Sequence, residues 1–186
     1  MQPLIRVDHS WAGLDNDGIL IGILAFRRLR ERLGSDFMNR VPKVRLATSS
    51  DAPALVNLND EFNGGRMPVA IVERRLQHGD EIVVICLLND EPVGFACAQT
   101  YTSFCYEELL GEITEIYVQE LARGIGLAGM MIECIEEQMR RQGVSTIKVL
   151  TGCDNDTAIR AYEKSGFVKE DEVMLEKQLN VGPDQA

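Results

Sequence analysis

The clearest pattern in the chain is a β-branched run followed closely by an amphipathic helix. Residues 112–118, Glu-Ile-Thr-Glu-Ile-Tyr-Val, are rich in β-branched and aromatic side chains, which favour a strand. After a short turn, apolar residues recur at the 3,4,7,8 spacing of one helix face, and we expect this helix to end near Gly143. The residues that form this face are Leu127, Met130, Met131, Cys134 and Ile135.

The same two patterns predict the other elements. Strands are expected at residues 44–47, 81–88, 93–101 and 144–150, and a last hairpin or strand at residues 168–179. Helices are expected from Pro53 to Phe62, over residues 69–77, and around Tyr162. Residues 89–92 read as a hairpin turn and residues 103–111 as a loop. The alternation of strands and helices predicts one mixed α/β domain over residues 43–180.

The two ends of the chain stand outside this domain. The apolar run at residues 18–26, followed by a basic cluster at 27–32, is shorter than the ~20 residues that a membrane span needs. A signal peptide would carry its positive charge before the apolar run. We therefore expect residues 1–42 to be a helical or disordered extension and residues 181–186 a short tail.

Charge and cysteine content narrow the function classes. A net charge of −10 argues against nucleic-acid binding, whose electrostatic footprint is basic, and weakly favours a cationic substrate. The five cysteines include no Cys-x-x-Cys pair, so we expect reduced thiols in the cytoplasm. His9 and His78 form no metal-ligand pattern, and no metal is predicted.

The turn between the 112–118 strand and its helix predicts a phosphate site. Gly124 and Gly126 allow the backbone to approach a ligand closely, and a helix start adds free N–H donors and positive dipole. The run lacks the Gly-Lys-Ser/Thr of a Walker loop and the three spaced glycines of a dinucleotide fingerprint. An anionic pyrophosphate fits this turn better than a nucleoside triphosphate or NAD.

Two motifs together resemble the GNAT N-acetyltransferase superfamily. Arg123, Gly126 and Ala128 match its Gln/Arg-x-x-Gly-x-Gly/Ala pyrophosphate loop, and residues 155–167 resemble its Asn-x-x-Ala-x-x-x-Tyr segment followed by Lys-x-Gly-Phe. The resemblance covers residues 44–179 and implies a GNAT fold, a mixed, mostly antiparallel sheet with helices on both faces. It also implies acetyl-CoA as the acyl donor.

The resemblance assigns residues that hold acetyl-CoA. Backbone amides of residues 123–128 would bind the pyrophosphate, and the edge of residues 116–118 would pair with the pantetheine arm as an added strand does. A backbone N–H near Val118 would stabilise the oxyanion, and Asn155 would contact the arm or simply cap its helix. The expected donor-binding residues are Ile116, Tyr117, Val118, Arg123, Gly124, Ile125, Gly126, Leu127, Ala128 and Asn155.

Three residues are candidates for proton transfer. Glu112 lies six residues before the final strand valine, where the family often has its base, and simple alternation puts it on one face with Thr114, Ile116 and Val118. Glu115 is the alternate base, although either carboxylate could be solvated. Tyr162 matches the family's general acid, but its phenol protonates a thiolate against the pKa gradient unless site charge lowers its pKa.

The resulting prediction is an N-acetyltransferase. The acceptor would be a primary amine of a small molecule, such as an aminoglycoside, polyamine or amino acid, or of a peptide. Asp60, Glu61, Glu107 and Glu108 could face a cationic acceptor or be simply solvated. A GNAT-like module that binds acyl-CoA or a partner without turnover is the alternative, and a longer acyl group stays open. No nucleic-acid or membrane partner is expected, and the chain could form a homodimer.

Overall fold

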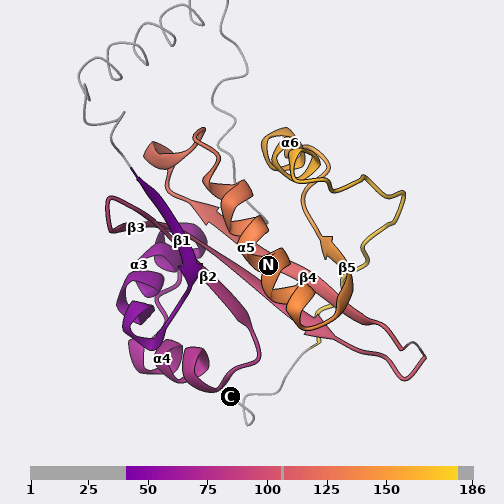
Figure 1. Cartoon of the computed structure of the whole chain (residues 1–186), viewed down its shortest axis with the longest axis horizontal. Helices are drawn as coiled ribbons and strands as arrows, with labels where there is room; N and C mark the ends of the chain where they lie inside the picture. The colour runs from indigo at the N-terminus through magenta and orange to yellow at the C-terminus, as the bar shows by residue number, and fades with distance from the viewer. Residues whose placement is uncertain (1–40, 106, 180–186) are drawn as a thin grey trace, which may run out of the picture.

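The computed structural model of the chain describes residues 41–105 and 107–179. Apart from Val41 and Pro42, the expected N-terminal extension at residues 1–42 lies outside these ranges, as does the tail at 181–186. In chain order the elements are β1 (Pro42–Leu46), η1 (Ser49–Asp51), α3 (Ala52–Asn63), α4 (Val69–His78), β2 (Ile82–Leu88), β3 (Glu91–Tyr101), β4 (Leu109–Val118), η2 (Glu120–Ala122), α5 (Leu127–Arg141), β5 (Val144–Val149) and α6 (Asp156–Lys164) (Figure 1).

The strands form one mixed sheet in the order β1-β2-β3-β4-β5. The first three pairings are antiparallel, and β4 and β5 are parallel and joined through α5. Asn89 and Asp90, with φ of 55° and 63°, form the tight turn between β2 and β3, a backbone conformation that asparagine and aspartate tolerate. The prediction of a mixed, mostly antiparallel sheet is confirmed.

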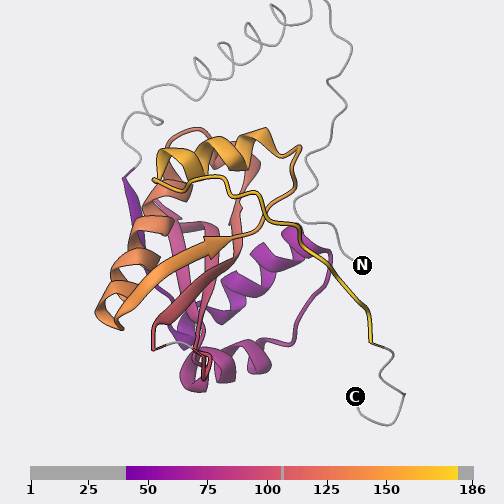
Figure 2. The ribbon, with the colours of Figure 1, turned by 90° about the vertical axis from the view of Figure 1, so that its right-hand side faces the viewer.

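Helices cover both faces of the sheet (Figures 1 and 2). On one face α5 packs Met131, Ile135 and Met139 against sheet residues that include Val84 and Ile113. On the other face α3 packs Leu55 and Leu58 against Ile85, Leu87 and Phe95, and α4 adds Val72 and Leu76 at the edge of this cluster. The two faces thus have separate apolar clusters, and a residue's place in β4 decides which one it joins.

A β-bulge at Thr114 changes which residues of β4 share a face. Cys97 of β3 pairs with Glu115, and its neighbour Ala98 pairs with Ile113, so Thr114 is an extra residue in β4. The extra residue reverses the alternation, and Ile113 therefore packs in the α5 cluster together with Ile116. The expectation that Glu112 shares a face with Ile116 and Val118 is wrong. Glu112 instead lies on the α3 face.

The last strands separate from each other where the bulge occurs. Pairing between β4 and β5 runs from Leu109 opposite Val144 to Ile113 opposite Val149. Beyond that point β4 continues to Val118, whereas β5 ends and the chain turns away toward α6 (Figure 1). Residues 114–118 therefore have no β5 partner along this edge of the sheet.

The predicted strand at residues 168–179 is not formed. After α6 the described chain runs without a helix or strand to Leu179 (Figure 2). Val168 and Leu175 are 80% and 90% exposed, and an exposed ion pair of 3.7 Å joins Lys148 Nζ of β5 to Glu172 Oε2 of this segment. Alternating apolar residues become a strand only when a neighbouring strand pairs with them, and no described strand does so here.

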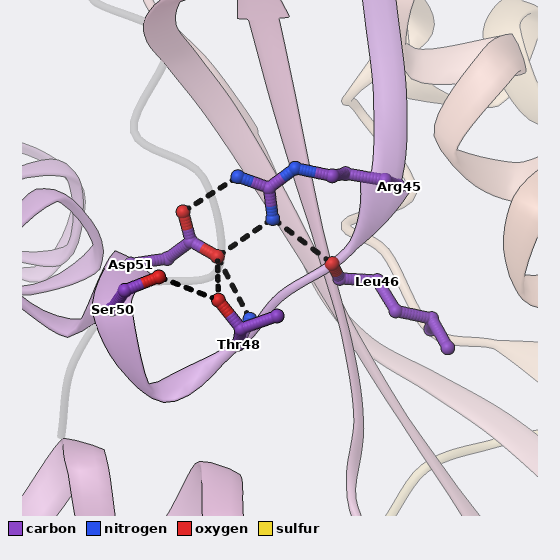
Figure 3. Close-up of polar contacts among 5 residues, drawn as sticks. All are labelled: Arg45, Leu46, Thr48, Ser50 and Asp51. Carbon is purple, nitrogen blue, oxygen red and sulfur yellow. Dashed lines mark hydrogen bonds and ion pairs between the residues drawn. The ribbon is translucent and has the colours of Figure 1, made fainter.

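A partly buried ion pair joins β1 to the start of α3 (Figure 3). Arg45 Nη1 and Nη2 donate to the two carboxylate oxygens of Asp51 at 2.6 and 2.7 Å. The Thr48 backbone N–H donates to Asp51 Oδ2 at 2.7 Å and its hydroxyl does so at 2.9 Å. The hydrogen bond from Arg45 is the largest effect that lowers the pKa of Asp51, from 3.8 to about 2.

Asp51→Asn is expected to destabilise the fold at neutral pH and not at strongly acid pH. Because the pKa of Asp51 is lower in the folded state, its contribution is fully present above pH 4 and is lost as pH falls through about 2. Because Arg45 is partly exposed, we expect the ion pair to contribute about 1–2 kcal/mol to the free energy of unfolding. Urea unfolding at several pH values measures it. Asp60→Asn is the control, because Asp60 and Arg66 form only an exposed pair of 3.9 Å, so a similar loss in this variant would contradict the assignment.

Candidate active site

The turn before α5 has the backbone geometry that its glycines suggest. Gly124 and Gly126 have φ of 82° and 88°, values that disfavour other residues, and α5 begins at Leu127 directly after them. A Cβ atom at either glycine would meet nothing within 4 Å, so the turn is open to solvent on that side. Glycine is required here by the backbone conformation and not by crowding.

Consecutive backbone N–H groups of this turn are free. Within the part of the chain that the structure describes, the N–H groups of residues 124–129 donate to no protein acceptor, and Met130 makes the first helical bond, to Gly126 O at 3.2 Å. They lie at the positive end of the α5 dipole. Such a set of donors at a helix start suits a phosphate or pyrophosphate group.

Arg123 differs from its neighbours in the turn. Its backbone N–H donates to Glu120 O at 3.2 Å, and its side-chain Nε donates to Val118 O at 2.8 Å. The expectation that the Arg123 amide is free for a ligand is therefore wrong, since the short η2 helix consumes that donor. Arg123 instead fastens the turn to the end of β4.

The end of β4 is also fastened to α3. Glu61 accepts hydrogen bonds from Tyr117 Oη at 3.1 Å and from Gln119 Nε2 at 3.0 Å. The Tyr117 ring packs with Phe62 and Phe95, at centroid distances of 5.3 and 6.0 Å. Tyr117 thus points its side chain to the α3 face. Only its backbone lies along the edge that β5 leaves free.

A pocket opens where β4 and β5 separate. Its lining comes from α3, both strands and α6, and includes two of the three predicted proton-transfer residues, Glu115 and Tyr162. Glu112, the first choice from sequence, does not line it. The lining residues are Phe62, Ile113, Thr114, Glu115, Ile116, Val149, Leu150 and Tyr162.

The two acid–base candidates reach this pocket from opposite faces of the sheet. Glu115 pairs with Cys97, which packs on the α3 face, whereas Tyr162 belongs to the α5 cluster. Sequence reasoning did not identify Phe62, because α3 and β4 are far apart in the chain. The sequence pattern predicted only that a helix extends to Phe62 and gave no indication that this ring borders an opening.

The environment raises the pKa of both groups. Burial raises the pKa of Glu115, and the negative charge of Glu81 adds to this effect. Burial also raises the pKa of Tyr162, to which the Glu115 charge contributes. Tyr162 is 8% exposed and its ring lies edge-on to Phe167, with centroids 5.9 Å apart. Full proton transfer from Tyr162 to a thiolate would need nearby charge that lowers the tyrosine pKa, and the site does the opposite. Tyr162 therefore stays protonated at neutral pH.

Comparison with known proteins identifies the family of this chain. Residues 52–167 match the model of the acetyltransferase (GNAT) family. The chain belongs to the GNAT family.

Individual GNAT relatives are distant. An acetyltransferase of Yersinia pestis is 28% identical over 114 residues, which cover 61% of this chain and 77% of the relative. An aminoglycoside acetyltransferase from an uncultured soil metagenomic sample, solved with trehalose, superposes with a TM-score of 0.67 at 18% identity over 75% of this chain and 97% of that one. An aminoglycoside N-acetyltransferase solved with CoA gives a TM-score of 0.65 at 18% identity over 75% of this chain and 96% of that one. The chain is thus an acyltransferase by family, and the solved structures support its fold.

Asn155 of the second GNAT motif has a structural task. Its Oδ1 accepts from Ala158 N at 3.2 Å, which caps α6, and its Nδ2 donates to Thr151 Oγ1 at 3.3 Å. The cap sets where α6 starts and so where Tyr162 lies. Contact between Asn155 and the donor substrate stays a prediction.

Other site types find no support in the described residues. Over residues 41–105 and 107–179, no three His, Cys, Asp or Glu side chains lie together as metal ligands would. All five cysteines are free thiols. No helix of the described chain is both long and apolar enough to cross a membrane.

Proposed function

We propose that this protein transfers the acetyl group of acetyl-CoA to a primary amine that carries positive charge. The observation that carries the proposal is the meeting of Glu115 and Tyr162 at the opening between β4 and β5. The free N–H groups of residues 124–129 lie at the start of the helix that follows β4. They fit the diphosphate of CoA, and the unpaired edge of residues 114–118 fits its pantetheine arm.

The two substrates would approach from different sides. The donor would lie along the free edge of β4, next to the turn before α5. The amine would enter from the α3 face, where Phe62 and Glu115 line the pocket. Glu61 on α3 and Glu81 before β2 add negative charge near this face, and the whole chain carries a net charge of −10. This charge favours a cationic amine through electrostatic attraction.

Glu115 and Tyr162 would divide the proton transfers. Glu115 takes a proton from the ammonium group, which leaves a neutral amine that can attack, and the raised pKa of Glu115 brings it closer to the pH at which it works. The nitrogen forms a bond to the thioester carbonyl carbon, and the carbon–sulfur bond breaks as the carbonyl re-forms. Tyr162 donates its phenolic proton or a hydrogen bond to the leaving sulfur. The nitrogen, which still carries one extra proton after attack, loses it to Tyr162 or to the leaving sulfur through solvent, and Glu115 releases the proton that it took to solvent. The two protons lost by the ammonium thus become the thiol proton of CoA and one solvent proton, and both side chains return to their starting states.

The raised pKa of Tyr162 limits what it can supply. A phenol with a pKa above its usual 10 cannot readily donate its proton fully to a thiolate whose conjugate acid has a pKa near 8.5. We therefore propose that Tyr162 acts mainly as a hydrogen-bond donor that stabilises negative charge on the sulfur as it leaves.

A thiol-release assay with acetyl-CoA over an amine panel tests the function. The panel holds aminoglycosides, polyamines, amino acids and lysine peptides, with uncharged amine analogues beside them. We expect turnover with at least one class, and higher kcat/KM for acceptors with more than one positive charge. Tight CoA binding without turnover of any amine would instead support a binding module.

A pair of variants at Gly126 ties the activity to the turn. Asparagine and aspartate have the same shape, and both tolerate positive φ better than most residues, so they strain the backbone similarly. Gly126→Asp adds negative charge at the proposed diphosphate site. Calorimetry should show a loss of CoA affinity of roughly tenfold or more relative to Gly126→Asn, which follows from a Coulomb repulsion of about 1–4 kcal/mol. Equal CoA affinities in the two variants would contradict the assignment of the diphosphate to this turn.

A further inference from the structure

Thr114, the extra residue of the β4 bulge, leaves its hydroxyl without a partner. Of the side chains in residues 41–105 and 107–179, its Oγ1 is the one buried nitrogen or oxygen that makes no hydrogen bond. Buried polar groups in folded proteins almost always have partners, because an unmet hydrogen bond destabilises the fold. An exception at a pocket calls for an explanation in terms of what binds there.

The position of Thr114 suggests that explanation. The residue lines the pocket beside Glu115 and Tyr162, at the point where β4 loses its pairing with β5. As a whole the residue is only partly buried, although its oxygen is covered. Rotation about χ1 moves the hydroxyl to another of the three staggered positions around Cβ, so the covered position of Oγ1 is not fixed.

We propose that the Thr114 hydroxyl donates a hydrogen bond to the acetyl carbonyl oxygen of the donor. This inference rests on the proposed function, and it assigns a catalytic residue beyond Glu115 and Tyr162. Negative charge develops on the carbonyl oxygen when the amine attacks, and that oxygen can accept more than one hydrogen bond. The carboxylate of Glu115 cannot donate to it, and Tyr162 is assigned to the sulfur. The unpartnered hydroxyl supplies a donor to complement a backbone N–H of β4.

The test uses Thr114→Val and Thr114→Ser in the full chain. Valine keeps the shape of threonine and removes the hydroxyl, whereas serine keeps the hydroxyl. Because the hydroxyl is unpartnered in the free protein, Thr114→Val should melt at the same temperature as the wild type or higher. We expect its kcat to fall by about tenfold to a thousandfold, the range seen when one oxyanion donor is removed. Thr114→Ser should recover most of this loss.

Binding gives a second readout that needs no turnover. CoA lacks the acetyl carbonyl, so Thr114→Val should leave the affinity for CoA unchanged and reduce the affinity for acetyl-CoA by about two- to tenfold. An unchanged ratio of acetyl-CoA to CoA affinity together with wild-type kcat would overturn the assignment. So would an effect confined to the KM of the amine, since that would place the hydroxyl on the acceptor.

Failure of the proposed function would look different. If the wild type turns over no amine, the acetylation proposal fails, while the ratio of the two affinities still decides whether Thr114 contacts the acetyl group. If the wild type acetylates an amine and Thr114→Val does so equally well, only the role of Thr114 fails.

Discussion

Glu115→Gln is expected to lower kcat by about 10² to 10⁴ at neutral pH, the range that general base catalysis contributes. Glutamine keeps the size of the side chain and cannot accept the ammonium proton. The loss should be largest at low pH, where the amine is fully protonated, and should shrink as the pH approaches the amine pKa near 10. A pH–rate profile of both proteins measures the effect.

The raised pKa of Glu115 allows folding to be separated from catalysis. A carboxyl group whose pKa is raised in the folded state destabilises the fold once it ionises, so removing its charge should not destabilise the protein at neutral pH. We expect Glu115→Gln to melt no lower than the wild type.

Glu112→Gln is the matched variant on the same strand. Glu112 lies on the α3 face but does not line the pocket, so this change should cost far less turnover than the change at Glu115. The opposite order, with Glu112→Gln inactive and Glu115→Gln active across the pH range, would show that the base is Glu112, the first choice from the sequence.

Tyr162→Phe is expected to reduce kcat by roughly ten- to a thousandfold with little change in the affinity for CoA. The ring packs against Phe167 and is almost fully buried, and phenylalanine preserves that packing. The loss therefore reports on the hydroxyl. Measuring kcat by thiol release and CoA affinity by calorimetry separates chemistry from binding.

The control for this variant is Tyr101→Phe, at the exposed end of β3. It removes a phenol that lies outside the pocket lining, and we expect it to behave as the wild type does. A better leaving group provides a second check, because a thioester with a more acidic thiol needs less help at the sulfur. If the defect of Tyr162→Phe stays the same size with such a donor, Tyr162 does not act on the sulfur.

Much of the fold follows from local patterns. The 3,4,7,8 spacing in α5, the β-branched apolar run of β2, and the proline near the start of α3 each specify an element within its own window. Gly124 and Gly126 indicate the turn for the same reason, since the positive φ they adopt is a local property. These features could be predicted because the neighbouring residues alone decide them.

The bulge at Thr114 could not be predicted in this way. A strand with one extra residue has the same β-branched composition as a regular strand, and only the pairing with β3 shows where alternation reverses. One residue of slip moves a side chain to the other face, so the face predicted for Glu112 was wrong. The prediction of a strand at residues 168–179 was wrong for a related reason, because a strand needs a neighbouring strand that the segment itself does not contain.

Long-range assembly explains the remaining differences. Phe62 reaches the pocket through the packing of α3 on the sheet, and Glu81 affects the Glu115 pKa from the start of β2. The Arg123 amide is consumed by η2, which the sequence pattern did not predict. The site therefore combines a locally encoded turn with a pocket that only the tertiary structure reveals.

The central claim is that the opening between β4 and β5 is where an acetyl group moves from sulfur to nitrogen. Mass spectrometry of the amine panel after incubation with isotopically labelled acetyl-CoA tests it most directly. The account predicts one amine class that gains the labelled acetyl group in equal amount to the CoA released, and a large loss of both in the variant that combines Glu115→Gln with Tyr162→Phe. A wild-type protein that binds CoA tightly and leaves every amine unlabelled, or a double variant that labels the amine as fast as the wild type, would contradict it.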